Sequence, residues 1–136
     1  NDALTLFLNP GQNTTNHFLG LKLEGTKSNN PGIGSKITVK IHEGNKERMI
    51  YREVNSGGSF GCSPLRQEIG IGSATIIDEL KIVWPASGKT QVFKNVKPNQ
   101  FIKVNEDKQV YEIMQINKIQ FIDLQNKIIM CSPSKK

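Results

Sequence analysis

One stretch of the chain contains a pattern associated with a catalytic serine. Residues 57–61 read Gly-Gly-Ser-Phe-Gly, which satisfies the G-x-S-x-G signature of a nucleophile elbow centred on Ser59. Such an elbow needs a helix directly after the serine and a histidine later in the chain. Residues 62–64 include a proline and do not favour a helix, and both histidines, His17 and His42, precede Ser59. We interpret the stretch as a glycine-rich turn. A hydrolase that uses Ser59 is kept as the second alternative, after the nucleic-acid binding considered below.

The other residue types that could do chemistry are few and widely spaced. The two histidines and two cysteines have neither C-x-x-C nor H-x-x-x-H spacing, so we expect no metal site, and no complete phosphate-binding motif predicts a cofactor. Asp78 and Glu79 are adjacent, and because adjacent strand residues face opposite ways, we do not expect them to cooperate as paired carboxylates. Cys62 and Cys131 could form one disulfide or remain separate thiols.

The positive charge of the chain suggests a second kind of site. The formal net charge is +6. Basic residues at strand positions that alternate with apolar ones predict a single basic face, formed by Lys22, Lys36, Lys40, Arg52 and Lys81. Such a face could attract acidic glycans or nucleic acid, or could be an ordinary solvated lysine surface. Single-stranded RNA is therefore the first alternative ligand, with Phe18 and Tyr51 as the nearby aromatic residues for base stacking.

Alternation of apolar and polar residues predicts the elements that position these groups. The apolar members, which we expect to form the core, are Leu19, Leu21, Leu23, Ile37, Val39, Ile41, Leu80, Ile82 and Trp84. This period-2 pattern is typical of strands with one buried face, and stretches rich in Gly, Asn, Ser and Pro separate them. A hairpin should join a strand at 35–43 to one at 48–54, so that Arg52 and Lys40 share a face. We predict an all-β antiparallel β-sandwich, which could be jelly-roll-like, with about eight to ten short strands. No apolar run approaches the roughly 20 residues that a membrane span needs.

The order of short motifs resembles the ASPIC/UnbV family over roughly residues 17–104. The matching motifs are Asn16-His17-Phe18-Leu19, Gly25-Thr26-Lys27-Ser28-Asn29, Gly32-Ile33-Gly34-Ser35-Lys36, Arg52-Glu53-Val54 with Ser56-Gly57-Gly58-Ser59, Gly70-Ile71-Gly72, Leu80 to Pro85 with Ser87-Gly88, and Lys94-Asn95-Val96. The chain departs from the family pattern at residues 60–64 and at Ile69-Gly70-Ile71-Gly72, where an aromatic-Gly-Leu-Gly turn is usual. A ligand role for the first of these loops is therefore open.

The resemblance implies a setting but brings no catalytic residues. Domains of this family stand near the C-terminus of secreted proteins, after FG-GAP or VCBS propeller repeats. We accordingly expect a junction with a short strand at 1–16, an ASPIC/UnbV-like β domain at 17–105, and a strand-leaning extension with a disordered end at 106–136. The expected role is that of a non-catalytic accessory or recognition domain in a larger extracellular, cell-surface or periplasmic protein. Its partners would be the upstream β-propeller of the same chain and a glycan or another extracellular protein.

Two loops are the expected contact regions, because loops on a rigid sheet scaffold commonly carry binding residues. In the loop that follows the strand at 17–25, the candidate ligand contacts are Lys27, Asn29 and Asn30. In the loop after residue 54, they are Ser56, Ser59 and Phe60.

Overall fold

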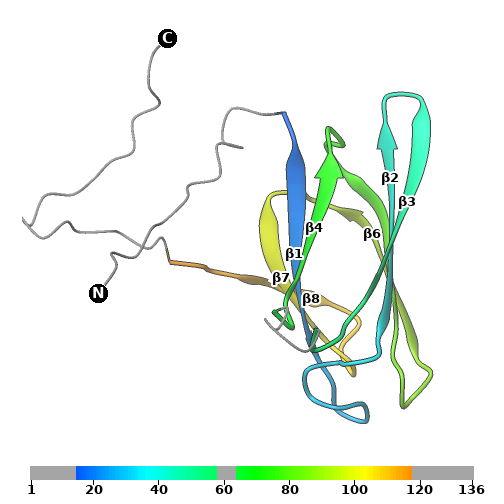
Figure 1. Cartoon of the computed structure of the whole chain (residues 1–136), viewed down its shortest axis with the longest axis vertical. Helices are drawn as coiled ribbons and strands as arrows, with labels where there is room; N and C mark the ends of the chain where they lie inside the picture. Colours follow the sequence, from blue (N-terminus) through cyan, green and yellow to red (C-terminus); the bar gives the residue numbers. More distant parts are fainter. Residues whose placement is uncertain (1–14, 58–63, 118–136) are drawn as a thin grey trace, which may run out of the picture.

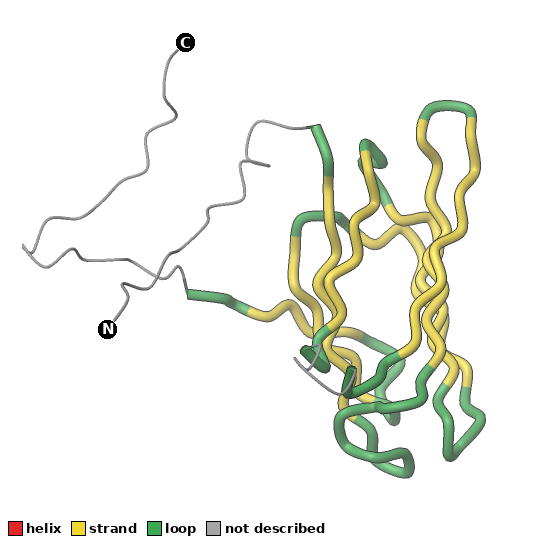
Figure 2. The backbone as a smooth tube through the Cα atoms, in the orientation of Figure 1, coloured by secondary structure: helices red, strands yellow, loops and turns green. Residues whose placement is uncertain are grey.

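The chain folds into two facing layers of β-strand. The computed structural model describes residues 15–57 and 64–117, and the layers are seen edge-on in Figure 1 and in the yellow segments of Figure 2. In chain order the strands are β1 (His17–Glu24), β2 (Lys36–Glu43), β3 (Lys46–Glu53), β4 (Gln67–Gly72), β5 (Ile77–Val83), β6 (Thr90–Val96), β7 (Gln100–Asn105) and β8 (Tyr111–Met114). The predicted all-β sandwich is confirmed. The strand expected at 3–8 lies outside the described residues.

Each layer is a four-stranded sheet. The β1 sheet has the order β4-β1-β7-β8, and the β2 sheet has the order β3-β2-β5-β6. Every neighbouring pair is antiparallel except β1 and β7, which run parallel from Leu19 beside Gln100 to Glu24 beside Asn105. A jelly roll consists of antiparallel Greek keys, so the parallel pair corrects the jelly-roll alternative and makes one sheet mixed.

The core fills the space between the two sheets. All the apolar residues predicted for it are at most 3% exposed, and Trp84 is fully buried. Ile69 and Ile71 of β4 and Ile102 and Val104 of β7 add to the same cluster. The alternation in the sequence therefore identified the buried faces correctly.

The described body continues beyond residue 105, the predicted end of the β domain. Glu106 is 1% exposed, and β8 pairs with β7 from Phe101 beside Met114 to Val104 beside Tyr111. The Tyr111 ring of β8 packs edge-on against the Phe93 ring of β6, with 5.7 Å between the ring centres. This contact joins the two sheets at the side formed by β8 and β6. Within the described part of the chain there is no helix long and apolar enough to cross a membrane.

The β2–β3 hairpin has a tighter turn than the sequence suggested. Gly44 and Asn45 alone connect the strands, so Glu43 pairs with Lys46 and Ile37 pairs with Arg52. Directly opposite residues of an antiparallel pair share a face. Arg52 therefore lies on the side of β3 that continues the buried face of β2, and the expectation that it shares a face with Lys40 is wrong.

Candidate functional site

A buried carboxylate organises the loops at one end of the sandwich. Glu106, in the turn after β7, accepts hydrogen bonds through Oε2 from the backbone N–H groups of Thr26, Lys27 and Ser28 at 2.7, 2.8 and 2.8 Å. Its Oε1 accepts from the hydroxyls of Ser28 and Ser87 at 2.8 and 2.6 Å. Three connections, β1–β2, β5–β6 and β7–β8, thus meet at one side chain.

The same contacts explain the acidity of this group. Burial alone raises the pKa of the Glu106 carboxyl, but the hydrogen bonds from the Ser87 hydroxyl and from Ser28 and Thr26 outweigh burial and lower the pKa from 4.5 to about 2. Hydrogen bonds to the charged form of a carboxyl favour ionisation. Glu106 therefore acts as a fixed anion that holds the loops.

Gln91 makes a second buried polar junction beside Glu106. Its Oε1 accepts a hydrogen bond from Trp84 Nε1 at 2.7 Å. Its Nε2 donates to the backbone carbonyls of Asn105, Glu106 and Lys108 at 3.0, 3.2 and 2.7 Å. Because each polar atom of the Gln91 amide has a partner, burial of this side chain carries no unsatisfied group.

Hydrogen bonds within the loop after β1 add to the contacts with Glu106. The Asn29 amide donates to the Ile33 carbonyl at 2.8 Å and accepts from the Ile33 N–H at 2.7 Å, and the Asn30 carbonyl accepts from the Gly25 N–H at 2.9 Å. The predicted contact Asn29 thus has its amide committed to the loop itself, whereas the side chains of Lys27 and Asn30 are exposed.

The second predicted contact loop begins at the same end. The Gly34 N–H donates to the Val54 carbonyl at 2.8 Å and the Val54 N–H donates to the Ser35 carbonyl at 3.1 Å, so the end of the first candidate loop lies beside the start of the second. Ser56 is exposed there. The remaining candidates of this region, Ser59, Phe60 and the Cys62–Cys131 pair, lie outside the described residues.

The structure does not gather the five basic candidates on one face. Lys36, Lys40 and Lys81 lie on the outer face of the β2 sheet, since Lys81 pairs with Thr38, which lies between Lys36 and Lys40 along that face. Lys22 lies on the outer face of the other sheet, beside Lys103. With Arg52 on the opposite side of β3, the predicted basic face is reduced to three lysines.

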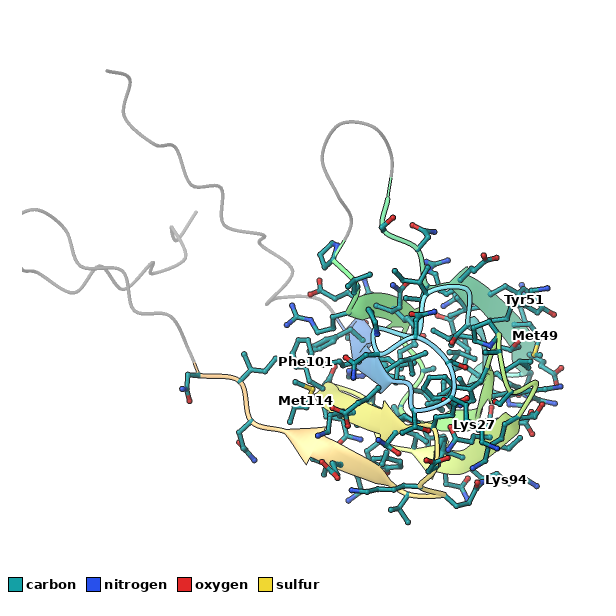
Figure 3. The ribbon with its side chains drawn as sticks, turned by 90° about the horizontal axis from the view of Figure 1, so that it is seen from below. Lys27, Met49, Tyr51, Lys94, Phe101 and Met114 are labelled. Carbon is teal, nitrogen blue, oxygen red and sulfur yellow. The ribbon has the colours of Figure 1, made fainter. Side chains whose placement is uncertain are left out.

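An open hollow lies among these lysines. We call it the Tyr51 hollow; its volume is about 520 Å³ and its lining includes Lys36, Thr38, Tyr51, Glu53, Lys81 and Val83. Tyr51, Thr38 and Lys81 form one row across β3, β2 and β5, and Glu53, Lys36 and Val83 form the next. The Tyr51 side chain is 67% exposed, and Figure 3 shows it beside Met49, away from the side that holds Phe101 and Met114.

The basic residues in the other rows of this face differ in their partners. Lys40 Nζ lies 2.7 Å from Glu47 Oε2, and the hydrogen bond with Glu47, followed by its charge, raises the pKa of Lys40. His42 Nδ1 lies 2.7 Å from Asp78 Oδ2. By contrast, Lys36 and Lys81 form no ion pair with any residue that the structure describes. Lys94 of β6, which pairs with Glu79 in the row next to the hollow, has no ion pair among the described residues either, so the unpaired lysines of this face lie in the Tyr51 hollow and beside it.

A β-bulge corrects one expectation about the acidic residues. Lys40 pairs with Glu79 but Ile41 pairs with Ile77, so Asp78 is an extra residue on β5. Such a bulge re-aims a side chain. Asp78 reaches His42 on the outer face, which also holds Glu79, so the two carboxylates do not face opposite ways.

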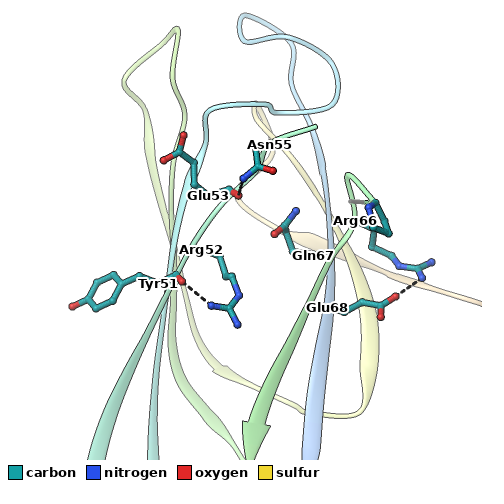
Figure 4. A pocket seen from close by; sticks show the side chains of 8 residues that line it. Tyr51, Arg52, Glu53, Asn55, Arg66, Gln67 and Glu68 are labelled. Carbon is teal, nitrogen blue, oxygen red and sulfur yellow. Dashed lines mark hydrogen bonds and ion pairs between the residues drawn. The ribbon is translucent and has the colours of Figure 1, made fainter. Parts of the chain in front are cut away.

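A cleft of about 420 Å³ lies between the edge strands β3 and β4. Arg52 and Gln67 project into it, whereas the Tyr51 ring projects away (Figure 4). Arg52 Nη1 donates to the Tyr51 carbonyl at 3.1 Å, and Arg66 at the rim is ion-paired with Glu68. Arg66 therefore has a carboxylate partner, although its Nε has no hydrogen-bond partner among the described residues, and Arg52 has a neutral carbonyl acceptor but no ion pair there.

The outer face of the β1 sheet is aromatic and close to charge-balanced. The Phe101 ring lies over Gly20. The centres of the Phe101 and Phe18 rings are 5.4 Å apart, and the Arg66 guanidinium carbon lies 4.8 Å from the centre of the Phe101 ring. Lys103 Nζ lies 3.0 Å from Glu112 Oε2, and this hydrogen bond raises the pKa of Lys103. A shallow hollow of about 400 Å³ near this face includes Lys22 and Asn30 in its lining.

Sequence reasoning did not identify Glu106 and Gln91 as buried polar residues, although a signal was present. Glu106 lies two residues after Val104 and four after Ile102, and Gln91 lies two residues before Phe93. Residues two apart in a strand share a face, so both polar residues fall on buried faces. A glycine within a strand pattern also marks close approach of another group, as Gly20 does for Phe101. Among residues 15–57 and 64–117, no group of three or more His, Cys, Asp or Glu side chains could hold a metal ion.

Comparison with known proteins gives one match. The sequence model of the family described as ASPIC and UnbV matches residues 25–110, which is more than half of the chain. No curated protein and no solved structure matches the chain.

Proposed function

Since the chain belongs to the ASPIC and UnbV family, we propose that it is a non-catalytic recognition domain that binds a glycan in the Tyr51 hollow. The family match confirms the resemblance found in the order of its motifs. The resemblance also supports the wider proposal that the domain works in a secreted or cell-surface protein, beside an upstream β-propeller. Sequencing the complete reading frame for propeller repeats and a secretion signal would test that wider setting.

The Tyr51 hollow is the observation that carries the proposal. A sugar ring offers C–H groups on its faces and hydroxyls at its rim. The exposed Tyr51 ring is suited to the C–H face, because an aromatic side chain offers a large apolar surface at little cost in conformational entropy. Glu53, Thr38 and the lysines around it offer acceptors and donors for the hydroxyls. The volume of about 520 Å³ is also in the range of small-ligand sites.

Two other ligand classes fit this surface less well. A stable protein interface usually has an apolar, aromatic-rich centre depleted of charge, whereas Lys36, Lys81 and Glu53 surround Tyr51. Single-stranded RNA binding usually combines a positive groove with several stacking rings. Here the aromatic pair Phe18 and Phe101 lies on the other sheet, where Arg66 and Lys103 are ion-paired. The hydrolase alternative depends on Ser59, which lies outside the described residues.

The test is a glycan-array screen of the 136-residue chain, followed by titration of the best ligand into variants. Tyr51→Ala should weaken binding at least tenfold, because it removes the stacking ring. Met49→Ala is the matched control, since Met49 lies on the same face of β3 one row away. It should bind within about twofold of the unmodified protein, as expected for a residue outside the contact area. Failure to bind any glycan, or equal loss in both variants, would contradict the proposal.

A further inference from the structure

We infer that the Tyr51 hollow selects anionic glycans, with a carboxylate or sulfate group of the sugar held between Lys36 and Lys81. This inference rests on the proposed function and narrows it to one ligand chemistry. It concerns residues that the strand register places together, although they are distant in the sequence.

The distribution of ion pairs over the outer face of the β2 sheet is the first argument. In the two rows next along this face, Lys40 and His42 each lie 2.7 Å from a carboxylate oxygen. In the rows of the hollow, Lys36 and Lys81 have none among the described residues. An unpaired ammonium group keeps its donors free for a ligand. Lys94 of β6, in the row next to the hollow, is also without an ion pair among the described residues, so the charge available to an incoming anion lies in the hollow and at its border.

The register gives the second argument. Lys36 pairs with Val83, and Lys81 precedes Val83 by two residues on the same face of β5. Residues in this diagonal relation are about 7–8 Å apart at their backbones, within reach of each other's long side chains. Two lysine side chains at that separation can donate to the same carboxylate or sulfate, and charge-assisted hydrogen bonds of this kind are stronger than neutral ones.

Glu53 adds a hydrogen-bond acceptor for sugar hydroxyls beside the two lysines. It pairs with Lys36 across β3 and β2 on the same face, yet no ion pair joins the two side chains. A carboxylate here can accept hydrogen bonds from the several hydroxyls of a sugar unit, whereas a nucleotide unit inside an RNA chain offers only its 2′-hydroxyl. The hollow thus suits a ligand in which an anionic group alternates with hydroxyl-bearing carbon.

The inference is tested by measuring affinity for four polymers at low and moderate salt. The polymers are polygalacturonate, the same chain fully methyl-esterified, heparin and poly(U) RNA. The double variant Lys36→Gln/Lys81→Gln is compared with Lys22→Gln/Lys97→Gln, which removes the same charge from the other sheet and from the β6–β7 turn. We expect methyl-esterification and the first double variant each to weaken polygalacturonate binding at least tenfold, and the control double variant to leave it within about twofold. Tighter binding of heparin than of polygalacturonate would identify sulfate rather than carboxylate as the preferred anion and would also support the inference.

The unfavourable outcomes separate the inference from the proposed function. If the esterified chain binds as tightly as the acid, the protein binds glycans but the anionic selectivity is refuted. Equal losses in the two double variants would likewise refute the role of Lys36 and Lys81 in favour of overall charge. Binding of poly(U) in preference to both glycans would replace the ligand class with nucleic acid. If no glycan binds in the array screen either, the proposed function itself fails.

Discussion

Replacing Glu106 by glutamine tests whether one buried anion holds the loop end together. Glutamine keeps the shape of the side chain but remains neutral, so it corresponds to permanently protonated Glu106. The carboxylate accepts three backbone N–H groups and two serine hydroxyls at 2.6–2.8 Å, and the residue is 1% exposed. The substitution therefore removes charge-assisted hydrogen bonds from a site that water barely reaches.

The expected magnitude follows from the pKa. The carboxyl has a pKa of about 2 in the folded protein against an ordinary 4.5. One pKa unit corresponds to about 1.4 kcal/mol, so ionised Glu106 stabilises the fold by about 3 kcal/mol at pH 7. Because the folded-state pKa is depressed, this contribution is complete above about pH 4.5 and is lost as the pH falls through 2. By the same relation, it is about 1 kcal/mol at pH 3.

Urea denaturation between pH 7 and pH 3 measures this difference directly. Glu106→Gln should lower the free energy of unfolding by about 3 kcal/mol at pH 7, and the gap to the unmodified protein should narrow steadily toward pH 3. Glu112→Gln is the control, because Glu112 is exposed and its pKa is lowered by hydrogen bonds first from Lys108, which is exposed, and then from Lys103, which is half-buried. Its effect should be much smaller, as is usual for surface ion pairs.

Two results would refute this reasoning. If Glu106→Gln has the same free energy of unfolding as the unmodified protein at pH 7, the hydrogen bonds to the Glu106 carboxylate only compensate for the water that this group loses on folding, and they add no net stability. If the difference is large but constant from pH 7 to pH 3, the loss comes from packing and the ionisation of Glu106 is irrelevant.

Two further predictions concern glycines. Gly20→Ala places a methyl group against the Phe101 ring and should cost about 1–3 kcal/mol in urea denaturation, whereas Gly70→Ala, which meets nothing within 4 Å, should cost far less. Gly72→Ala should cost more than Gly44→Ala: both positions have φ of +60°, but a side chain at Gly72 also meets a carboxylate of β2, while Gly44 faces open space. Equal losses within either pair would show that the close contact is not the cause.

Local pattern was enough to identify most of the strands and the core. Alternation of Leu19, Leu21 and Leu23, and of the corresponding residues of β2 and β5, can be satisfied only by a strand with one buried face, whatever its neighbours are. The order of short motifs identified the family for a similar reason, since each motif is a local feature of the chain.

Pairing, register and loop closure were decided by the tertiary structure. The parallel β1–β7 pair joins segments about 80 residues apart, which no local pattern specifies. The register of the β2–β3 hairpin pairs Arg52 with Ile37 and Met49 with Lys40, and because side chains alternate along a strand, Arg52 and Lys40 lie on opposite faces.

The candidate site shows the same division. The lysines and Tyr51 were visible in the sequence, but the single basic face was wrong. Lys22 belongs to a different sheet, and the combination of Lys36, Lys81 and Tyr51 exists only because β3, β2 and β5 lie side by side. The sequence thus determined which residues are buried and which are exposed, because that depends on local alternation. Only the tertiary structure decided which exposed residues are neighbours, because that depends on pairing between distant segments.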